Sequence, residues 1–490
     1  MTLSPALFAR IRVILHLCGF LVMLYSSSML LPTLIALFDH DRSYTDFLAT
    51  FAVFFSCGGG LWVATRRPGL QLQTRDGFII IVLFWLLFSV ISAMPFWLNN
   101  SLSFSFADAL FEGVSGITTT GATVVGEISR LPASYLFYRA QLNYIGGLGV
   151  IVLAVAVLPM LGIGGMRLYQ SEMPGPFREE RLTPRLADTA KSLWLVYFAL
   201  GTTCVLAYWA AGLPFFDAIC HGLSTVSLGG FSTHSESLGF YQSPAAELVA
   251  GTFSLLSALN FTLWYMALVK RTIRPFRNNA ELKFFLAVVF VVVLITAWQV
   301  WQAGMYDLPH SIVHAYFLAS SMLTDNGLAT GDYAGWPSHT IIFLLMASFF
   351  GGCVGSTCGG VKALRFLVLF LQSRHEIHQL AHPRAVLSVR VGSAAVSDRV
   401  LRSVSSFFFL YAVITALLIW LLNMMGCDLL TAFATVAACI NNMGLGFGET
   451  ASTFGTLSNP AKYLMCGAML MGRLEIYPVL ILCSRFFWRS

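Results

Sequence analysis

Charged residues are scarce in this sequence. Asp, Glu, Lys and Arg make up 11% of its 490 residues, whereas a soluble globular domain contains about 25%. In contrast, 57% of the residues are hydrophobic, and the mean hydropathy is +0.75. A single aqueous core cannot bury so much apolar surface, so the composition excludes a soluble enzyme and a disordered chain. It predicts an integral membrane protein whose solvent is lipid.

The ten cysteines do not indicate a secreted disulfide scaffold, because most of them lie inside apolar runs. Cys18, Cys204 and Cys466 are examples, and we expect free buried thiols at such positions. A cleavable signal peptide is not expected either. The first apolar run extends from near Ile11 to Phe38 without a small-residue cleavage site, so it predicts a spanning helix.

Ten apolar runs are candidates for membrane spans, since a hydrocarbon core about 30 Å thick is crossed by about 20 helical residues. They lie near residues 11–38, 47–64, 78–98, 135–161, 191–212, 245–269, 283–304, 340–371, 404–425 and 461–484. The run 340–371 is too long for one straight span, and two glycine-rich breaks interrupt it, Gly351-Gly352 and Gly355–Gly360. The sequence therefore predicts an all-α membrane protein with ten transmembrane helices.

Positive charge is distributed unevenly between the two sets of connecting loops, within a net charge of +6. Of the 29 Lys and Arg residues, 22 lie in loops on the side of both termini, and the other side holds only Arg42, Arg130, Arg139 and Lys462. Cytoplasmic loops of membrane proteins carry the excess of Lys and Arg. The pattern predicts that both termini are cytoplasmic, which agrees with an even number of spans.

Four loops on the charge-poor side resemble one another. Each has a short apolar stretch followed by a glycine-rich tip, and they align on Gly121, Gly230, Gly327 and Gly446. The position twelve residues earlier is then alanine in all four loops, at Ala109, Ala218, Ala315 and Ala434. The position six residues earlier is serine in the first three loops, at Ser115, Ser224 and Ser321. The fourth register stays open, because Gly444 would place Ala432 at the same offset.

These loops favour a cation pathway. A helical stretch of about 13 residues is too short to cross a bilayer, so each loop is expected to enter the membrane and return. Non-helical backbone at that depth is tolerated only where it is buried in protein or lines a water-filled cavity. Four such loops around one axis would present rings of carbonyl oxygens, which can replace the hydration shell of a monovalent cation. Glycine permits the backbone to turn in this way, and the partially negative C-terminal ends of the short helices would also favour a cation.

At these residues the sequence resembles the Trk/Ktr/HKT superfamily of potassium transporters, and most closely its bacterial TrkG/TrkH subfamily. The stretches that carry the resemblance are Gly116–Thr123, Ile145–Gly149, Leu158–Gly162, Ser224–Thr233, Gly351–Thr357 and Gly472–Glu475. The resemblance implies four pseudo-symmetric membrane–pore–membrane repeats around one pore, after two N-terminal helices. The implied divisions are 1–76 for those two helices and 77–166, 167–277, 278–375 and 376–490 for the four repeats.

The resemblance also implies which residues bind potassium, mainly through backbone carbonyls. They are Thr119, Thr120, Gly121, Leu228, Gly229, Gly230, Asp325, Asn326, Gly327, Gly444, Leu445 and Gly446. In this superfamily, glycine at all four filter positions accompanies a preference for potassium. Small or hydroxyl residues are commoner where this chain has Leu228 and Asp325-Asn326. A less selective potassium/sodium pathway is therefore the alternative.

Two further features are expected below the filter. In the family, an unwound loop in the second span of repeat 3 acts as an intramembrane gate, and here this gate loop is residues 351–360. The expected gate residues are Gly355, Ser356, Thr357, Cys358, Gly359, Gly360 and Arg473. Arg473 lies about mid-span, where the family places an arginine in the pore. It either pairs with a carboxylate such as Glu475 or forms an electrostatic barrier to cations.

The resemblance further implies a homodimer in the bacterial inner membrane, regulated by cytosolic TrkA-type subunits that bind NAD and adenine nucleotides. Potassium is the expected cargo, and no nucleic acid partner is expected. This chain itself is expected to bind no nucleotide, because Gly162–Gly165 lacks the full fingerprint of a dinucleotide site.

Two alternatives to passive potassium uptake stay open, a proton-coupled symporter and a multi-span membrane enzyme. An enzyme would need acidic, histidine or metal-binding residues that converge near one interface. The outer loops offer glycine, serine, threonine and backbone instead. We therefore expect no enzymatic activity.

Overall fold

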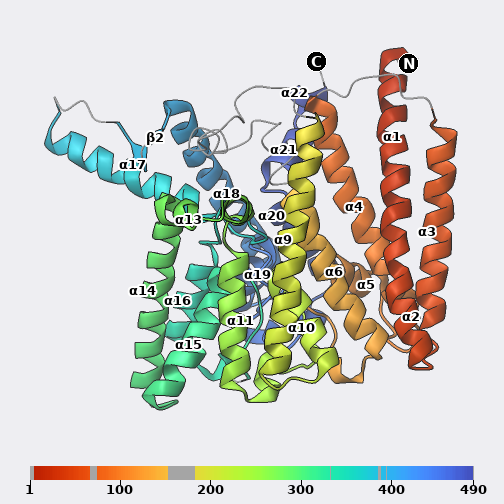
Figure 1. Cartoon of the computed structure of the whole chain (residues 1–490), viewed down its shortest axis with the longest axis horizontal. Coiled ribbons are helices and arrows are strands. Elements are labelled where there is room, and N and C mark those ends of the chain that lie inside the picture. The colour runs from red at the N-terminus through yellow and green to blue at the C-terminus, as the bar shows by residue number, and fades with distance from the viewer. Residues whose placement is uncertain are drawn as a thin grey trace.

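The computed structural model describes residues 5–66, 74–152, 183–331, 333–383, 388–392 and 394–488. Long helices run side by side between two faces of the molecule (Figure 1). Within the described ranges the only strands are β1 (Arg390–Val391) and β2 (Ala394–Ala395), which pair antiparallel. Four features named above lie outside these ranges: the end of the run 135–161 after Val152, the stretch Leu158–Gly162, the repeat boundary at 166–167, and Gly162–Gly165.

Six continuous helical stretches in the described chain are long and apolar enough to cross a membrane. The first is α1 (Pro5–Ser26), which continues through η1 (Ser27–Met29) into α2 (Leu30–Phe38). The others lie in α3 (Tyr44–Ala64), α4 (Thr74–Leu98), α9 (Thr183–Ala210), α14 (Ala280–Gln302) and α18 (Asp398–Met424). The helical membrane class is therefore confirmed, whereas the count of ten spans stays a prediction.

Three of the predicted spans are broken helices. The run 340–371 is interrupted as its glycines predict, because residues 349–362 separate α16 (Ser338–Ser348) from α17 (Ala363–Ala381). The other two breaks were not predicted from the sequence. Between α11 (Pro244–Ser257) and α12 (Phe261–Lys270) the chain bends by 85°, and between α20 (Asn459–Arg473) and α21 (Tyr477–Cys483) it bends by 114°.

The first of these unpredicted breaks depends on tertiary contact. The backbone N–H of Cys353 donates to the carbonyl of Ala258 at 2.9 Å, and the N–H of Phe261 donates to the carbonyl of Gly355 at 3.1 Å. The gate loop therefore supplies partners for backbone groups that a continuous helix would have paired internally.

Four short helices, called here the re-entrant helices, are too short to cross a membrane. They are α5 (Phe106–Ile117), α10 (Phe215–Ser227), α15 (Leu308–Leu323) and α19 (Leu429–Ile440). Side-chain caps start two of them: Ser105 and Asp108 form a capping box before α5, and Asp428 accepts the N–H groups of Leu430 and Thr431 before α19. The helices α10 and α15 begin near the face opposite the two termini and rise into the molecule (Figure 1).

The helix that follows each re-entrant loop packs on the re-entrant helix of the next repeat. These following helices are α6 (Ala133–Val152), α11, α16 and α20. Helix α6 packs on α10, α11 on α15, α16 on α19, and α20 on α5. The last contact joins α20 to α5, so the four units, each a re-entrant helix with its flanking helices and called here a repeat, close into a cycle.

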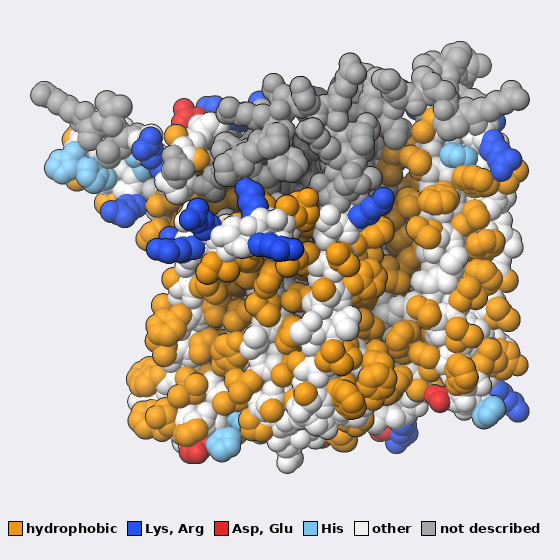
Figure 2. All heavy atoms as spheres, in the orientation of Figure 1, with side chains coloured by type: hydrophobic (Ala, Val, Ile, Leu, Met, Phe, Trp, Pro, Cys, Tyr) orange, Lys and Arg blue, Asp and Glu red, His pale blue; other side chains and the backbone are white. Residues whose placement is uncertain are grey.

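Shorter elements complete the two faces. On the side of the re-entrant loops lie η2 (Ile128–Arg130), η4 (Ser237–Tyr241), η5 (Tyr333–Gly335), η6 (Gly448–Thr450) and η7 (Phe454–Thr456). Two short helices, α13 (Arg274–Asn278) and α22 (Arg485–Trp488), lie on the side where α1 begins. Figure 2 shows apolar side chains across the middle of the molecule and Lys and Arg gathered near that same side. All ten cysteines are free thiols, as predicted, but the expected burial holds for seven of them, because Cys57 and Cys483 are exposed and Cys427 is partly exposed.

Candidate functional site

Four glycines from the four re-entrant loops meet around one centre. Gly121, Gly230, Gly327 and Gly444 all have positive φ, at 82°, 72°, 76° and 83°. A Cβ on any of them would lie closer than 3.0 Å to a carbonyl oxygen of another repeat. The partners follow in order: Gly121 faces the carbonyl of Gly229, Gly230 that of Asn326, Gly327 that of Met443, and Gly444 that of Thr120. We call these four glycines, with the residue before each, the ring.

The ring contains Gly444 and not Gly446, which corrects the register on Gly446. Gly446 has no positive φ, lies two residues beyond the ring, and accepts a hydrogen bond from the Tyr333 hydroxyl at 3.4 Å. Leu445 likewise follows the ring, whereas Met443, which the sequence did not single out, belongs to it. The alternative alignment on Ala432 was therefore the correct one.

A common backbone pattern ends the four re-entrant helices and turns the chain into the ring. The residue two positions before each ring glycine is left-handed, although none of the four is glycine: Thr119, Leu228, Asp325 and Asn442. The N–H of the residue just before each ring glycine then donates to the carbonyl six positions before that glycine, at Ser115, Ser224, Ser321 and Ala438. The serine that recurs in the first three loops thus marks the carbonyl that closes each of those three helices.

Two of the side chains at the left-handed positions pack among the surrounding helices, whereas that of Asn442 reaches Thr120 and that of Asp325 faces the gate loop. Leu228 is buried in the main apolar cluster, and Thr119 lies against Gly146 of α6. Asn442 donates to the hydroxyl of Thr120 at 3.0 Å and to the carbonyl of Met469 at 2.9 Å. A bulky residue such as Leu228 is therefore accommodated, because its side chain packs in the core.

All four ring glycines line one cavity of about 270 Å³ on the side where the re-entrant loops return to the surface. Thr123, Ser232, Thr330, Leu445 and Gly446 also line it. The four loops thus share one cavity. Within the described residues no group of three or more His, Cys, Asp or Glu side chains could hold a metal ion.

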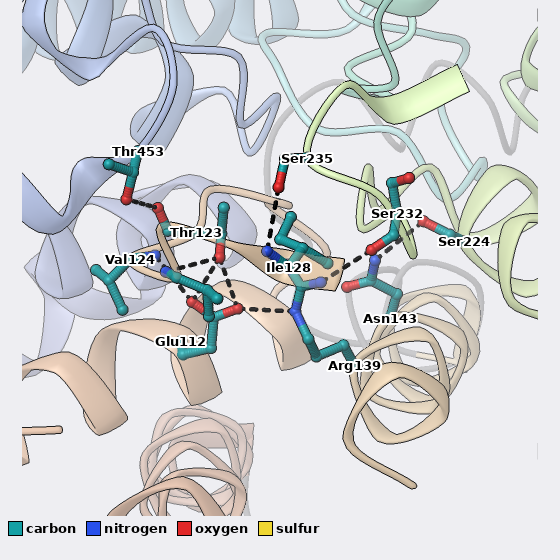
Figure 3. Close-up of polar contacts among 11 residues, drawn as sticks. Glu112, Thr123, Val124, Ile128, Arg139, Asn143, Ser224, Ser232, Ser235 and Thr453 are labelled. Atoms are coloured by element: carbon teal, nitrogen blue, oxygen red, sulfur yellow. Dashed lines mark hydrogen bonds and ion pairs between the residues drawn. The ribbon is translucent and has the colours of Figure 1, made fainter. Parts of the chain in front are cut away.

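A buried ion pair braces the first two repeats behind the ring (Figure 3). Arg139 of α6 pairs with Glu112 of α5 at 2.9 Å, and the two side chains are 1% and 0% exposed. Glu112 also accepts the Thr123 hydroxyl and the Val124 N–H, each at 3.0 Å. Arg139 donates to the carbonyl of Ser232 at 2.9 Å, so one ion pair fixes the chain after Gly121 and after Gly230.

This ion pair was not predicted, although the sequence carries a signal for it. Glu112 lies nine residues before Gly121, and His221 lies nine residues before Gly230. The His221 ring makes the corresponding contact in repeat 2, with Nε2 2.9 Å from the Ser232 hydroxyl. In repeat 3 the matching position is apolar, at Leu318.

Ion pairs also join repeats that are far apart in the sequence. Lys462 of α20 pairs with Asp108 of α5 at 2.7 Å, which closes the cycle between repeats 4 and 1. Glu247 of α11 lies 2.7 Å from His314 of α15 and accepts the Thr330 hydroxyl at 2.9 Å, which joins repeats 2 and 3.

The gate loop lies on the other side of the ring from the cavity, among the C-terminal ends of the re-entrant helices. Its backbone is close-packed: a Cβ on Gly359 would lie closer than 3.0 Å to the carbonyl of Asn441, and Gly360 has a positive φ of 64°. Gly355 and Ser356 turn the loop back toward α12, and the Ser356 hydroxyl donates to the carbonyl of Cys353 at 2.6 Å. The expected gate residues are therefore together.

Three cationic side chains surround the gate loop. Arg473 donates to the carbonyl of Thr357 at 3.0 Å, and its Nε and second terminal nitrogen have no hydrogen-bond partner in the described part of the chain. Lys362 donates to the carbonyl of Cys358. Glu475 pairs with Arg365, not with Arg473, so the pairing of Arg473 with Glu475 is wrong.

Comparison with known proteins identifies the family of the chain. The family model TrkH, described as a cation transport protein, matches residues 43–489. The Trk system potassium uptake protein TrkG of Escherichia coli (strain K12) is 65% identical over 482 residues, covering 98% of this chain and 99% of that protein. The Trk system potassium uptake protein TrkH of Salmonella typhimurium is 41% identical over 480 residues, with 98% and 99% covered.

A solved structure has the same fold. The crystal structure of the potassium transporter TrkH from Vibrio parahaemolyticus matches with a TM-score of 0.91 at 40% identity, covering 98% of this chain and 100% of that one. The matched proteins are transporters by name, not enzymes. By sequence and by fold alike, the chain belongs to the TrkH family of cation transport proteins.

Proposed function

We propose that this protein takes up potassium across the bacterial inner membrane through the ring. The observation that carries the proposal is the cyclic contact of the four ring glycines with the carbonyls of Thr120, Gly229, Asn326 and Met443. Carbonyl oxygens gathered around one axis can replace the hydration shell of potassium. The relatives named as potassium uptake proteins support this choice of ion.

The ring favours potassium because its donors are uncharged backbone oxygens held at four related positions. The partially negative C-terminal ends of α5, α10, α15 and α19 add a field that attracts cations. The side chains of Leu228 and Asn326 do not weaken this account, since Leu228 packs in the core and Asn326 donates to the Ser254 hydroxyl at 2.6 Å.

The gate loop and Arg473 would control this flux from below the ring. Gly355 to Gly360 lie beneath the ring, and Arg473 holds the loop through the carbonyl of Thr357. A buried guanidinium on the pathway repels cations, so the arrangement corresponds to a closed gate.

We further propose that the protein works as a homodimer with both termini in the cytoplasm, where TrkA-type subunits that bind NAD or adenine nucleotides regulate the gate. The 22 Lys and Arg residues in the loops on the side of the termini support this orientation. The same basic loops offer positive charge to a cytosolic partner.

Rubidium uptake into proteoliposomes tests the proposal, because rubidium reports the potassium pathway. The purified full chain should take up rubidium down its gradient, and potassium should compete more strongly than sodium. Equal competition by sodium would favour the less selective pathway. Uptake that requires a proton gradient would favour symport, and absence of cation flux with and without a cytosolic subunit would refute the proposal.

A further inference from the structure

The gate loop is hydrogen-bonded to the ends of the re-entrant helices. The Thr357 hydroxyl lies 3.3 Å from the carbonyl of Val226 at the end of α10. The N–H of Gly360 donates to the carbonyl of Asn441, just after α19, at 3.1 Å. The loop therefore occupies carbonyls at the partially negative helix ends. Its closed position is held by the same elements that carry the ring.

Cys358 makes the corresponding contact in the third repeat. Its thiol donates to the carbonyl of Thr324, with Sγ 2.9 Å from the oxygen, and lies 3.4 Å from a carboxylate oxygen of Asp325. The Sγ atom also accepts the N–H of Gly352 at 2.8 Å. One buried thiol, 2% exposed, thus joins the start and the end of the gate loop to the two residues that lead into the third ring segment.

Asp325 links this contact to the ring. It is fully buried and left-handed, with φ at 57°, and its other carboxylate oxygen has no hydrogen-bond partner among the described residues. A Cβ on Gly360 would lie 3.0 Å from the Asp325 carboxylate, so the gate loop packs directly against it. The next residue is Asn326, whose carbonyl faces the ring glycine Gly230. A rotation at Asp325 therefore changes the direction of a ring carbonyl.

We propose that Cys358 is a positioning residue that couples the gate loop to the third ring segment. The thiol holds the loop in its closed position, and the same contact holds Thr324 and Asp325 in the conformation that directs the Asn326 carbonyl. The inference rests on the proposed function. Loss of the thiol frees the loop and loosens the ring segment, so basal flux rises and discrimination against sodium falls together.

The test compares Cys358→Ala, Cys358→Ser and a control, Cys204→Ala, in proteoliposomes without a cytosolic subunit. Cys204 is also fully buried, but it packs in the apolar cluster around α9. We expect Cys358→Ala to raise initial rubidium uptake by about three- to tenfold, which corresponds to about 0.7–1.4 kcal/mol and lies within the net contribution of one hydrogen bond. Sodium should compete at least threefold more strongly with this variant. Cys358→Ser keeps a donor and should stay within twofold of the parent, as should Cys204→Ala.

The alternative outcomes are distinct. Raised uptake with unchanged sodium competition would confine Cys358 to the gate and overturn the coupling. Unchanged uptake, with a fall in thermal unfolding midpoint like that of Cys204→Ala, would reduce Cys358 to a packing residue and overturn the inference. A parent protein that takes up no rubidium either with or without a cytosolic subunit would instead refute the proposed function, and this inference would fall with it.

Discussion

Replacing Gly444 by alanine tests the ring most directly. Gly444 has a φ of +83°, and its Cβ would lie closer than 3.0 Å to the carbonyl oxygen of Thr120 and 2.9 Å from the N–H nitrogen of Ala122. Left-handed backbone costs an L-residue about 1–2 kcal/mol. The contact with Thr120 adds to this cost. The backbone fixes the position of the added Cβ, and the atom it meets is a backbone oxygen, so no side-chain rotation relieves the contact. We expect the first and fourth segments to separate and the ring to widen.

Gly304→Ala is the matched control for this change. Gly304 has a φ of +69°, and a Cβ there would meet no atom within 4 Å. The control therefore carries the backbone strain of about 1–2 kcal/mol without a contact at the ring. We expect it to lower the thermal unfolding midpoint slightly and to leave rubidium uptake and sodium competition unchanged.

The assay measures rubidium uptake against increasing sodium for the parent and both variants. We expect Gly444→Ala to lose discrimination at least tenfold, which corresponds to about 1.4 kcal/mol between the two ions. Parental uptake and parental discrimination in a folded Gly444→Ala protein would refute the assignment of the ring as the ion pathway. A loss of discrimination in Gly304→Ala as well would show that general strain, not ring geometry, caused the effect.

Three further changes test other parts of the structure. Gly121→Ser also places a side chain at a positive φ within the ring, so sodium should compete more strongly with rubidium at unchanged protein yield; equal ratios in variant and parent would argue against the ring. Arg473→Ala removes a charge and a contact to the gate loop, so rubidium leak should rise, and an unchanged flux would contradict the barrier. Arg139→Met leaves Glu112 buried without its cation, and thermal unfolding should show a loss of about 3–5 kcal/mol, whereas Arg130→Met in an exposed pair should change stability by about 0–1 kcal/mol.

The re-entrant loops illustrate what could be predicted from sequence. Glycine and serine recur at fixed offsets because each loop must end a short helix and reverse its backbone at the same depth, and these requirements are local. The choice between Gly444 and Gly446 could not be made in this way. Both fit the local pattern, and only the approach of Gly444 to the carbonyl of Thr120, more than 300 residues away in the sequence, separates them.

The breaks in the spanning helices also differ in whether the sequence predicts them. The glycines at Gly351–Gly360 predict the interruption there. The bend after Ser257 is not, because its backbone groups are paired by the gate loop of another repeat. The ion pair between Glu112 and Arg139 is an intermediate case. The sequence shows a polar residue nine positions before the ring glycine in the first two loops, but it does not show that Arg139 pairs with Glu112.

By itself, the sequence determined that the chain needs a bilayer and which set of loops carries the positive charge. It also determined that four loops share one pattern, a short apolar stretch followed by a glycine-rich tip. These properties follow from composition and short-range spacing, which act wherever the chain lies. Tertiary structure alone decided which glycine completes the ring, which cation pairs with which carboxylate, and what the gate loop contacts. Each of these depends on segments that meet only when the four repeats close into a cycle, because backbone groups without water in a membrane protein must find their partners across that cycle.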